Sequence, residues 1–178
     1  LKLSRGLGDV YKRQAMNMIK EGPREKVGRG QPIIPLQLNP YAAFSFGIAF
    51  HIHRIEVALA NFCGEVIDTE TIDYAEDAPI IDVLKNIKAQ IDVLVDKHKI
   101  QNARILGIGV SMPGPSEGDG KSIRTIIQMG HWRGVDLASI FGDVFEWPVW
   151  IDNDCNVAVV GEFYSCLLYT SDAADDDA

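Results

Sequence analysis

The sequence predicts an α/β fold in which a three-strand antiparallel meander is followed by alternating helices and strands. Three short runs rich in Val, Ile, Ala and Phe follow one another with turn-like residues between them, which is typical of consecutive hairpins. Beyond residue 78 the apolar residues recur at helical spacing and then alternate with short apolar runs, which indicates helices packed on a sheet. With 178 residues, 47% of them hydrophobic, the chain has enough apolar material for one domain with a core.

The three runs of the meander are Phe44–Phe50, Arg54–Asn61 and Gly64–Ile72. His51–His53 and Cys63–Gly64 provide the turns between them. Each run is rich in the β-branched and aromatic residues that favour strands.

An amphipathic helix is predicted from Ala78 to His98, because apolar residues recur there every three or four positions. The remaining predicted elements are, in order, a buried strand at Ile105–Ser111, a short strand near Ser122–Ile127, a helix capped by Asp136, a strand at Pro148–Ile151 and a helix at Asp154–Tyr164. Near the start of the chain, Ala15–Gly22 has the pattern of a helix end stopped by a glycine, and the basic stretch REKVGRGQP that follows predicts a turn or linker.

Composition limits the cellular environment and the kinds of partner that the protein can have. No apolar run is long enough to cross a bilayer, and no start resembles a signal peptide. The three cysteines form no close pair and no metal-ligand spacing, so we expect a reducing, cytoplasmic setting. The net charge of −8 argues against nucleic-acid binding across the surface of this chain.

Both termini differ in character from the rest of the sequence. Residues 4–14 and 166–176 each resemble the translation of a transposon-derived sequencing adapter. We therefore predict that residues 1–14 and 166–178 are adapter-derived and that the natural piece, residues 15–165, is cut at both ends.

The stretch WIDNDCNVAVVGEF places polar residues at the end of a predicted strand and the start of a helix. In open α/β sheets that edge is where ligands bind. Asn153 can donate and accept hydrogen bonds, and Asp154 can accept a hydroxyl proton, which suits a polyhydroxylated ligand. The alternative is that Asp152, Asn153 or Asp154 caps the helix, although one cap needs only one of the three.

A second candidate is the loop after the predicted strand at Ile105–Ser111. Gly114 lies there between two prolines, a pattern that indicates a rigid turn where the backbone can approach a ligand. His51 and His53 have no acidic or cysteine partner nearby in the sequence, so we expect turn residues and no metal site. His131, beside Trp132, is expected in packing or in a ligand loop.

Four stretches together resemble the ROK family, which contains bacterial sugar kinases and sugar-responsive transcriptional repressors. They are GIAFHIHRIEVALANFCGEVI, ILGIGVSMPGPSEGDG, HWRGVDLASIFGDVFEWPVWIDNDCNVAVVGEF and the linker-like GRGQPIIPLQLNP, and they are spread along residues 28–165. The resemblance implies an actin-like (ribonuclease-H-like) ATPase fold built from two halves. Residues 31–165 would be the N-terminal lobe of the sugar-binding domain, in truncated form.

The resemblance also implies roles for individual residues. Asn153 matches a sugar-hydroxyl ligand, Asp154 matches the base that accepts the proton of the attacking hydroxyl, and Gly114 matches a loop glycine close to the sugar. Gln128 stands where many members carry a sugar-contacting Asn. The zinc-binding cysteines and the second nucleotide loop of the family would follow residue 165, so we expect no cofactor in this chain and zinc only in a missing C-terminal part.

The first predicted hairpin departs from the family's kinase pattern. Family kinases carry Asp-x-Gly-Gly-Thr there, whose glycines admit phosphate and whose Asp helps to hold the metal. Here the Asp position is Ala49, the glycines are His51 and Ile52, and the Thr is His53. We therefore expect ATP binding by this hairpin to be badly impaired. The replacement favours a protein without enzyme activity, and a carbohydrate kinase is the class that would apply otherwise.

Repressor members of the family place a winged helix-turn-helix before the sugar domain, with a connection like residues 28–40. Residues 15–30 would then be the end of that DNA-binding domain with its wing and linker. Arg24, Lys26 and Arg29 are the candidate DNA contacts. The alternative is a solvated basic linker.

The expected function is that of a fragment of a sugar-responsive repressor, which binds a sugar or sugar phosphate and, when intact, binds DNA as a homodimer or higher oligomer. Two alternatives stay open. One is an ATP-dependent sugar kinase of the glucokinase or N-acetylhexosamine kinase type. The other is a sugar-binding module without DNA contact.

Overall fold

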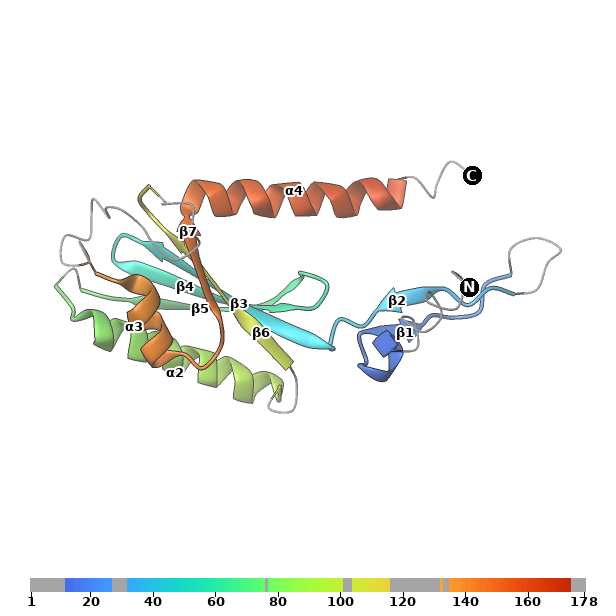
Figure 1. The fold of residues 1–178 in the computed structure, drawn as a ribbon, viewed down its shortest axis with the longest axis horizontal. Helices are drawn as coiled ribbons and strands as arrows, with labels where there is room; N and C mark the ends of the chain where they lie inside the picture. Colours follow the sequence, from blue (N-terminus) through green and yellow to red (C-terminus); the bar gives the residue numbers. More distant parts are fainter. Residues whose placement is uncertain are drawn as a thin grey trace.

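A five-stranded sheet in the order β5-β4-β3-β6-β7 forms the centre of the molecule (Figure 1). The computed structural model describes residues 12–26, 32–75, 77–100, 104–115, 132 and 135–173. The strands are β3 (Ala43–His51), β4 (Arg54–Asn61), β5 (Val66–Asp73), β6 (Arg104–Met112) and β7 (Val149–Asn153). The first three form an antiparallel meander, and β6 and β7 are added parallel to β3.

The predicted α/β architecture is confirmed; the ends of β4 are as predicted, and those of the other sheet strands differ from the predicted ends by one or two residues. The start of β5 shows why. Asn61 Oδ1 accepts hydrogen bonds from the backbone N–H groups of Cys63 and Glu65, at 2.9 and 3.1 Å, and Gly64 has a φ of +81°. The turn therefore continues through Glu65, and the strand begins at Val66.

Two helices cover one face of the sheet, and a third lies over the other face (Figure 1). They are α2 (Ile80–His98) and α3 (Leu137–Val144) on the first face and α4 (Asp154–Ala173) on the second. The predicted cap of α3 is confirmed, because Asp136 Oδ1 accepts a hydrogen bond from the backbone N–H of Ser139 over 3.1 Å.

The core lies between the sheet and α2 and α3. Alternate residues of β3 point into it, and the apolar stripe of α2 packs against them; these residues are Phe44, Phe46, Ile48 and Phe50 with Val83, Leu84, Ile87, Ile91 and Leu94. Trp132 is buried in the same core, with its ring centroid 5.3 Å from that of Phe50. Trp132 is therefore a core residue.

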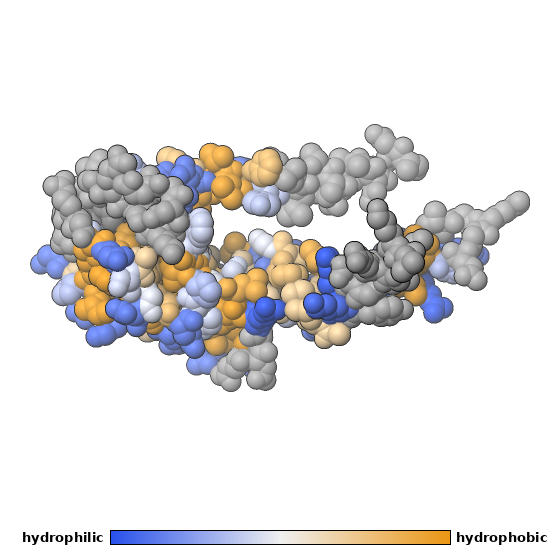
Figure 2. All heavy atoms as spheres, in the orientation of Figure 1, coloured by the Kyte–Doolittle hydropathy of each residue, from blue (hydrophilic) through white to orange (hydrophobic). Residues whose placement is uncertain are grey.

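The opposite face of the sheet carries small residues at its centre, Gly47, Ala49, Ala58 and Gly109, and forms the floor of a cavity. Every described side chain of α4 is exposed, and Figure 2 shows open space between this helix and the body beneath it. Val160 of α4 and Trp150 of β7 are 53% and 60% exposed on the two sides of that space. The helix is thus attached to the sheet mainly through its first turn.

A small hairpin precedes the sheet and lies beyond its end (Figure 1). Strands β1 (Ile19–Glu21) and β2 (Leu36–Leu38) pair antiparallel, and a bridge between Glu25 and Ile33 extends the pairing. The predicted helix over Ala15–Gly22 is wrong, because only residues 12–15 of this part are helical.

The physical reason for this error is pairing across the hairpin. The β1–β2 ladder and the hydrogen bond from Gly22 N–H to Pro35 O, at 2.7 Å, satisfy backbone groups that a helix would otherwise have paired locally. Asn17, with a φ of +59°, ends the short helical turn.

Several predictions fall on other parts of the chain. Arg29, Gln128, His131, the predicted strand at Ser122–Ile127 and residues 1–11 and 174–178 lie outside the described residues. None of the helices described is long and apolar enough to cross a membrane.

Candidate functional site

The candidate site lies where the parallel strands β6 and β7 end. Ser111 pairs with Asp152, and Met112 pairs with Asn153. Strand β7 runs to Asn153, two residues beyond the predicted end at Ile151. The polar residues therefore lie at the carboxyl edge of the sheet, next to the loop that carries Gly114.

Asn153 caps α4. Its Oδ1 accepts hydrogen bonds from the backbone N–H groups of Cys155, at 2.9 Å, and Asn156, at 3.3 Å. Of the three residues considered for this role, Asn153 accepts two backbone N–H groups of the first turn, and Asp154 Oδ1 accepts one of the same two, that of Cys155, at 2.8 Å.

Asn153 also contacts the second candidate loop. Its Nδ2 donates a hydrogen bond to the backbone oxygen of Gly114 over 2.7 Å, although the two residues are 39 positions apart. Gly114 has a φ of +136°, a conformation that side-chain-bearing residues rarely adopt. The structure thus brings two of the predicted sugar-site residues into direct contact.

Asp154 is exposed at the start of α4. Its Oδ1 accepts hydrogen bonds from Cys155 N–H, at 2.8 Å, and from Asn153 Nδ2, at 2.9 Å. Among the described residues no donor is bonded to the other carboxylate oxygen, Oδ2. That oxygen can accept a hydrogen bond from a ligand hydroxyl.

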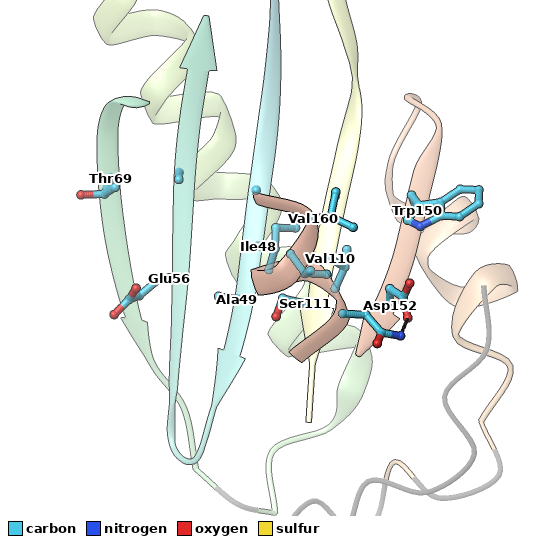
Figure 3. Close-up of a pocket in the computed structure, with 14 residues that line it drawn as sticks. Ile48, Ala49, Glu56, Thr69, Val110, Ser111, Trp150, Asp152 and Val160 are labelled. Atoms are coloured by element: carbon cyan, nitrogen blue, oxygen red, sulfur yellow. Dashed lines mark hydrogen bonds between the residues drawn. The ribbon is translucent and has the colours of Figure 1, made fainter. Parts of the chain in front are cut away.

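A row of side chains crosses the open face of the sheet beside this edge. Strand register places Glu56, Ala49, Ser111 and Asp152 on four adjacent strands in that order, and Figure 3 shows their side chains around one cavity. Asp152 Oδ1 accepts hydrogen bonds from Asn153 N–H, at 2.7 Å, and from Asn156 Nδ2, at 3.0 Å. Ala49 therefore lies in the same row as the site edge, where the family pattern would place a carboxylate.

The cavity between the sheet and α4 has a volume of about 410 Å³. Its floor consists of the small residues Gly47, Ala49, Ala58 and Gly109. Val157 and Val160 of α4 line the opposite side. Polar groups gather at one end, and these are Glu56, Ser111, Asp152 and Asn156. Glu56, Ser111 and Asn156 are not among the site residues predicted from the sequence. The alternation of side chains along each strand can be seen in the sequence, but only the pairing register between the strands shows that these three residues lie around one cavity.

The β3–β4 hairpin has a tight turn without glycine, formed by Ile52 and His53. His51 pairs with Arg54, Ile52 is 52% exposed at the tip, and His53 has a φ of +61°. Glu56 Oε1 lies 3.0 Å from Arg54 Nη2, so this carboxylate is paired with a cation. Within the described ranges, no group of three His, Cys, Asp or Glu side chains could hold a metal ion.

The candidate DNA contacts Arg24 and Lys26 are exposed on the β1–β2 hairpin. Figure 1 shows that hairpin extending away from the sheet. Both side chains are thus accessible to a partner, and their role as DNA contacts stays a prediction.

Three comparisons relate the chain to known proteins. The model of the ROK family matches residues 45–167. A xylose repressor of Caldicellulosiruptor bescii is 30% identical over 145 residues, with 82% of this chain and 36% of the repressor covered. A glucokinase of Halalkalibacterium halodurans is 28% identical over 110 residues, with 62% of this chain and 33% of the glucokinase covered.

Among solved structures, the crystal structure of a ROK family transcriptional regulator, a homolog of the E. coli MLC protein, superposes with a TM-score of 0.54 at 25% identity. The match covers 82% of this chain and 36% of the regulator. It confirms the predicted actin-like α/β fold class. The chain spans about a third of the length of these relatives, and the family model matches well over half of the chain. The chain therefore belongs to the ROK family.

Proposed function

We propose that this chain is the N-terminal lobe of the sugar-binding domain of a transcriptional repressor, and that it binds a sugar without phosphorylating it. Asn153, Asp154 and Gly114, which hydrogen bonds of Asn153 Nδ2 join, form the described part of the proposed sugar site. Gln128 is proposed as a further contact.

The hairpin between β3 and β4 carries this proposal. A phosphate loop needs small residues at its tip so that backbone N–H groups reach the phosphates. Here the tip carries the side chains of Ile52 and His53, and Ala49 replaces the carboxylate that would help to hold a metal. The neighbouring Glu56 does not substitute for it, because its Oε1 is 3.0 Å from the Arg54 guanidinium.

The extent of the matches supports a repressor. The glucokinase match covers 62% of the chain. A match of that length fits within residues 45–167, the segment that the family model matches. The matches to the xylose repressor and to the ROK regulator each cover 82% of the chain, and so must include residues outside that segment.

The N-terminal hairpin fits the wing of a winged helix-turn-helix. It is a two-stranded antiparallel ribbon with Arg24 and Lys26 exposed, and basic side chains on such a ribbon can contact phosphate. In the proposed mechanism, sugar binding changes the angle between the two halves of the actin-like fold. That change alters the spacing of paired DNA-binding domains and weakens operator binding.

The test uses the full-length protein and the DNA upstream of its own gene. Fluorescence anisotropy measures operator binding with and without D-xylose and D-glucose, two sugars taken from the names of the relatives. We expect at least one of them to weaken operator binding, and we expect Asp154→Asn to remove this response while leaving sugar-free operator binding unchanged. Asp143→Asn, on the exposed side of α3, is the matched control and should respond like the wild type.

Operator binding that is the same with and without each sugar would contradict the proposal. Sugar binding without any DNA binding would instead establish a sugar-binding module.

A sugar kinase is the second candidate, because Asp154 is present and a glucokinase is among the relatives. This function predicts ATP-dependent phosphorylation of a sugar by the full-length protein, abolished by Asp154→Asn. The hairpin geometry leads us to expect no such activity.

A further inference from the structure

Three glycines of the sheet and of α4 have no local reason to be glycine. Gly47 of β3 and Gly109 of β6 are partners in the sheet register, and Gly161 lies within α4. None of the three has a positive φ. Among the described residues, an added Cβ would meet nothing within 4 Å at Gly109 or Gly161, and at Gly47 only the Cβ of Ala58, at 4.0 Å. Neither the backbone conformation nor a neighbouring atom therefore requires glycine at these positions.

Glycine has a cost at all three positions, because it loses more backbone freedom on folding than any other residue. Within a strand it often marks a bulge or a place where another backbone approaches closely. A bulge is not the reason here, since the register shift between β3 and β6 lies between Phe44 and Phe46, and Gly47 pairs regularly with both Ala58 and Gly109. The close approach of another backbone is the explanation that fits.

Helix α4 is the element in position to approach. Val157 and Val160 line the cavity on the side opposite its floor, and Figure 3 draws Val160 among the side chains around the cavity. Gly161 follows Val157 by four positions, so helical spacing places the two on the same side of α4. Val160 is 53% exposed, and Trp150 of β7, the register partner of Gly109, is 60% exposed. Apolar surfaces of the helix and of the sheet thus face each other across open space.

We infer that α4 has a second, closed position, in which its Val157–Gly161 side packs directly on the floor of the cavity. Gly109 and Gly47 let the helix backbone come close, and Gly161 adds no side chain between the two layers. Closure removes the valines and part of the Trp150 ring from water, which favours the closed position. The helix moves about its first turn, where it joins β7. The structure shows the open position, and the inference does not depend on the proposed binding of sugar or DNA.

Disulfide trapping in the full-length protein tests the closed position. The variant Ala58→Cys/Val160→Cys has one thiol on the floor and one on the cavity side of α4. A disulfide needs Cα atoms about 4.4–6.8 Å apart, so it forms only when α4 lies directly on the sheet. Ala58→Cys/Val159→Cys is the matched control, because Val159 is 69% exposed and does not line the cavity. Mild oxidation followed by peptide mass spectrometry identifies the linked positions, and circular dichroism checks that each variant is folded.

We expect a disulfide between positions 58 and 160, and at least about ten times less between positions 58 and 159. Adding Gly109→Val to the first pair should slow trapping by about tenfold. A Cβ at Gly109 meets nothing in the open position, but the valine would occupy the space that the closed helix needs, and overpacking of this kind is costly.

Three results would overturn the inference. The absence of a disulfide between positions 58 and 160 would show that α4 does not reach the sheet, as when a later segment of the full-length protein fills the cavity. Equal trapping of both pairs would show a loosely moving helix without a packed closed position. Undiminished trapping with Gly109→Val would show that the helix does not pack on the glycines. None of these results bears on the proposed sugar binding, which the operator measurements test separately.

Discussion

Gly107 of β6 faces the backbone of Pro148, and a Cβ at position 107 would lie 2.7 Å from the Pro148 carbonyl oxygen. The same oxygen accepts a hydrogen bond from Ile108 N–H over 2.9 Å. The contact is therefore part of the junction between β6 and the start of β7. Only a residue without a side chain allows the two backbones to approach this closely.

Gly107→Ala should destabilise the chain for this reason. We expect a loss of about 1–3 kcal/mol in the free energy of unfolding, the usual cost of forcing extra atoms into a packed region. Gly109→Ala, two residues along the same strand, is the matched control, because a Cβ at Gly109 meets nothing within 4 Å. Urea denaturation followed by circular dichroism measures both, and equal stabilities of the two variants would contradict the proposed clash.

An ion cluster joins β5 to the end of α2 and predicts a pH dependence of stability. Asp68 Oδ2 lies 2.8 Å from Lys97 Nζ and 2.7 Å from His98 Nε2. Hydrogen bonds from Lys97 and then His98 lower the pKa of Asp68 from 3.8 to about 2. The same contact with Asp68 raises the pKa of Lys97 above 10.5.

A lowered carboxyl pKa stabilises the fold above the unfolded-state value and is lost as the pH falls through the folded-state value. Asp68→Asn should therefore unfold at lower urea concentration than the wild type near neutral pH. The difference should shrink as the pH falls below 3.8 and disappear only below about pH 2. Asp73→Asn is the control, since Asp73 of the same strand forms no ion pair within the described part of the chain. A difference that stays constant down to pH 2 would contradict the prediction.

The cap of α3 gives a third prediction. Asp136 Oδ1 accepts the Ser139 N–H hydrogen bond at the start of the helix, so Asp136→Ala should cost about 0.5–2 kcal/mol of stability. Asp143→Ala changes the same residue type in the last turn, where a negative charge opposes the helix dipole, and should be neutral or slightly stabilising. Thermal unfolding of the two variants measures the contrast, and an unchanged Asp136→Ala would show that the cap does not contribute.

Much of the sheet could be predicted because its information is local. Alternation along Phe44–Phe50 places every second side chain in the core, and the stripe from Val83 to Leu94 defines the buried face of α2. The adjacency of Asn153 and Asp154 at a strand end was equally visible in the sequence. Ala15–Gly22 was predicted wrongly because its partner strand, Leu36–Leu38, lies farther along the chain and competes with the local helical pattern.

The family, the buried faces of the elements and the polar residues at the end of β7 can all be recognised in the amino-acid sequence. The contacts among those polar residues depend on the fold. Asn153 reaches Gly114, and Ala49 lies in one row with Ser111 and Asp152, because β6 pairs in parallel with both β3 and β7 in a particular register. That register depends on backbone hydrogen bonds between distant segments, and a shift of one residue would turn each of these side chains to the other face.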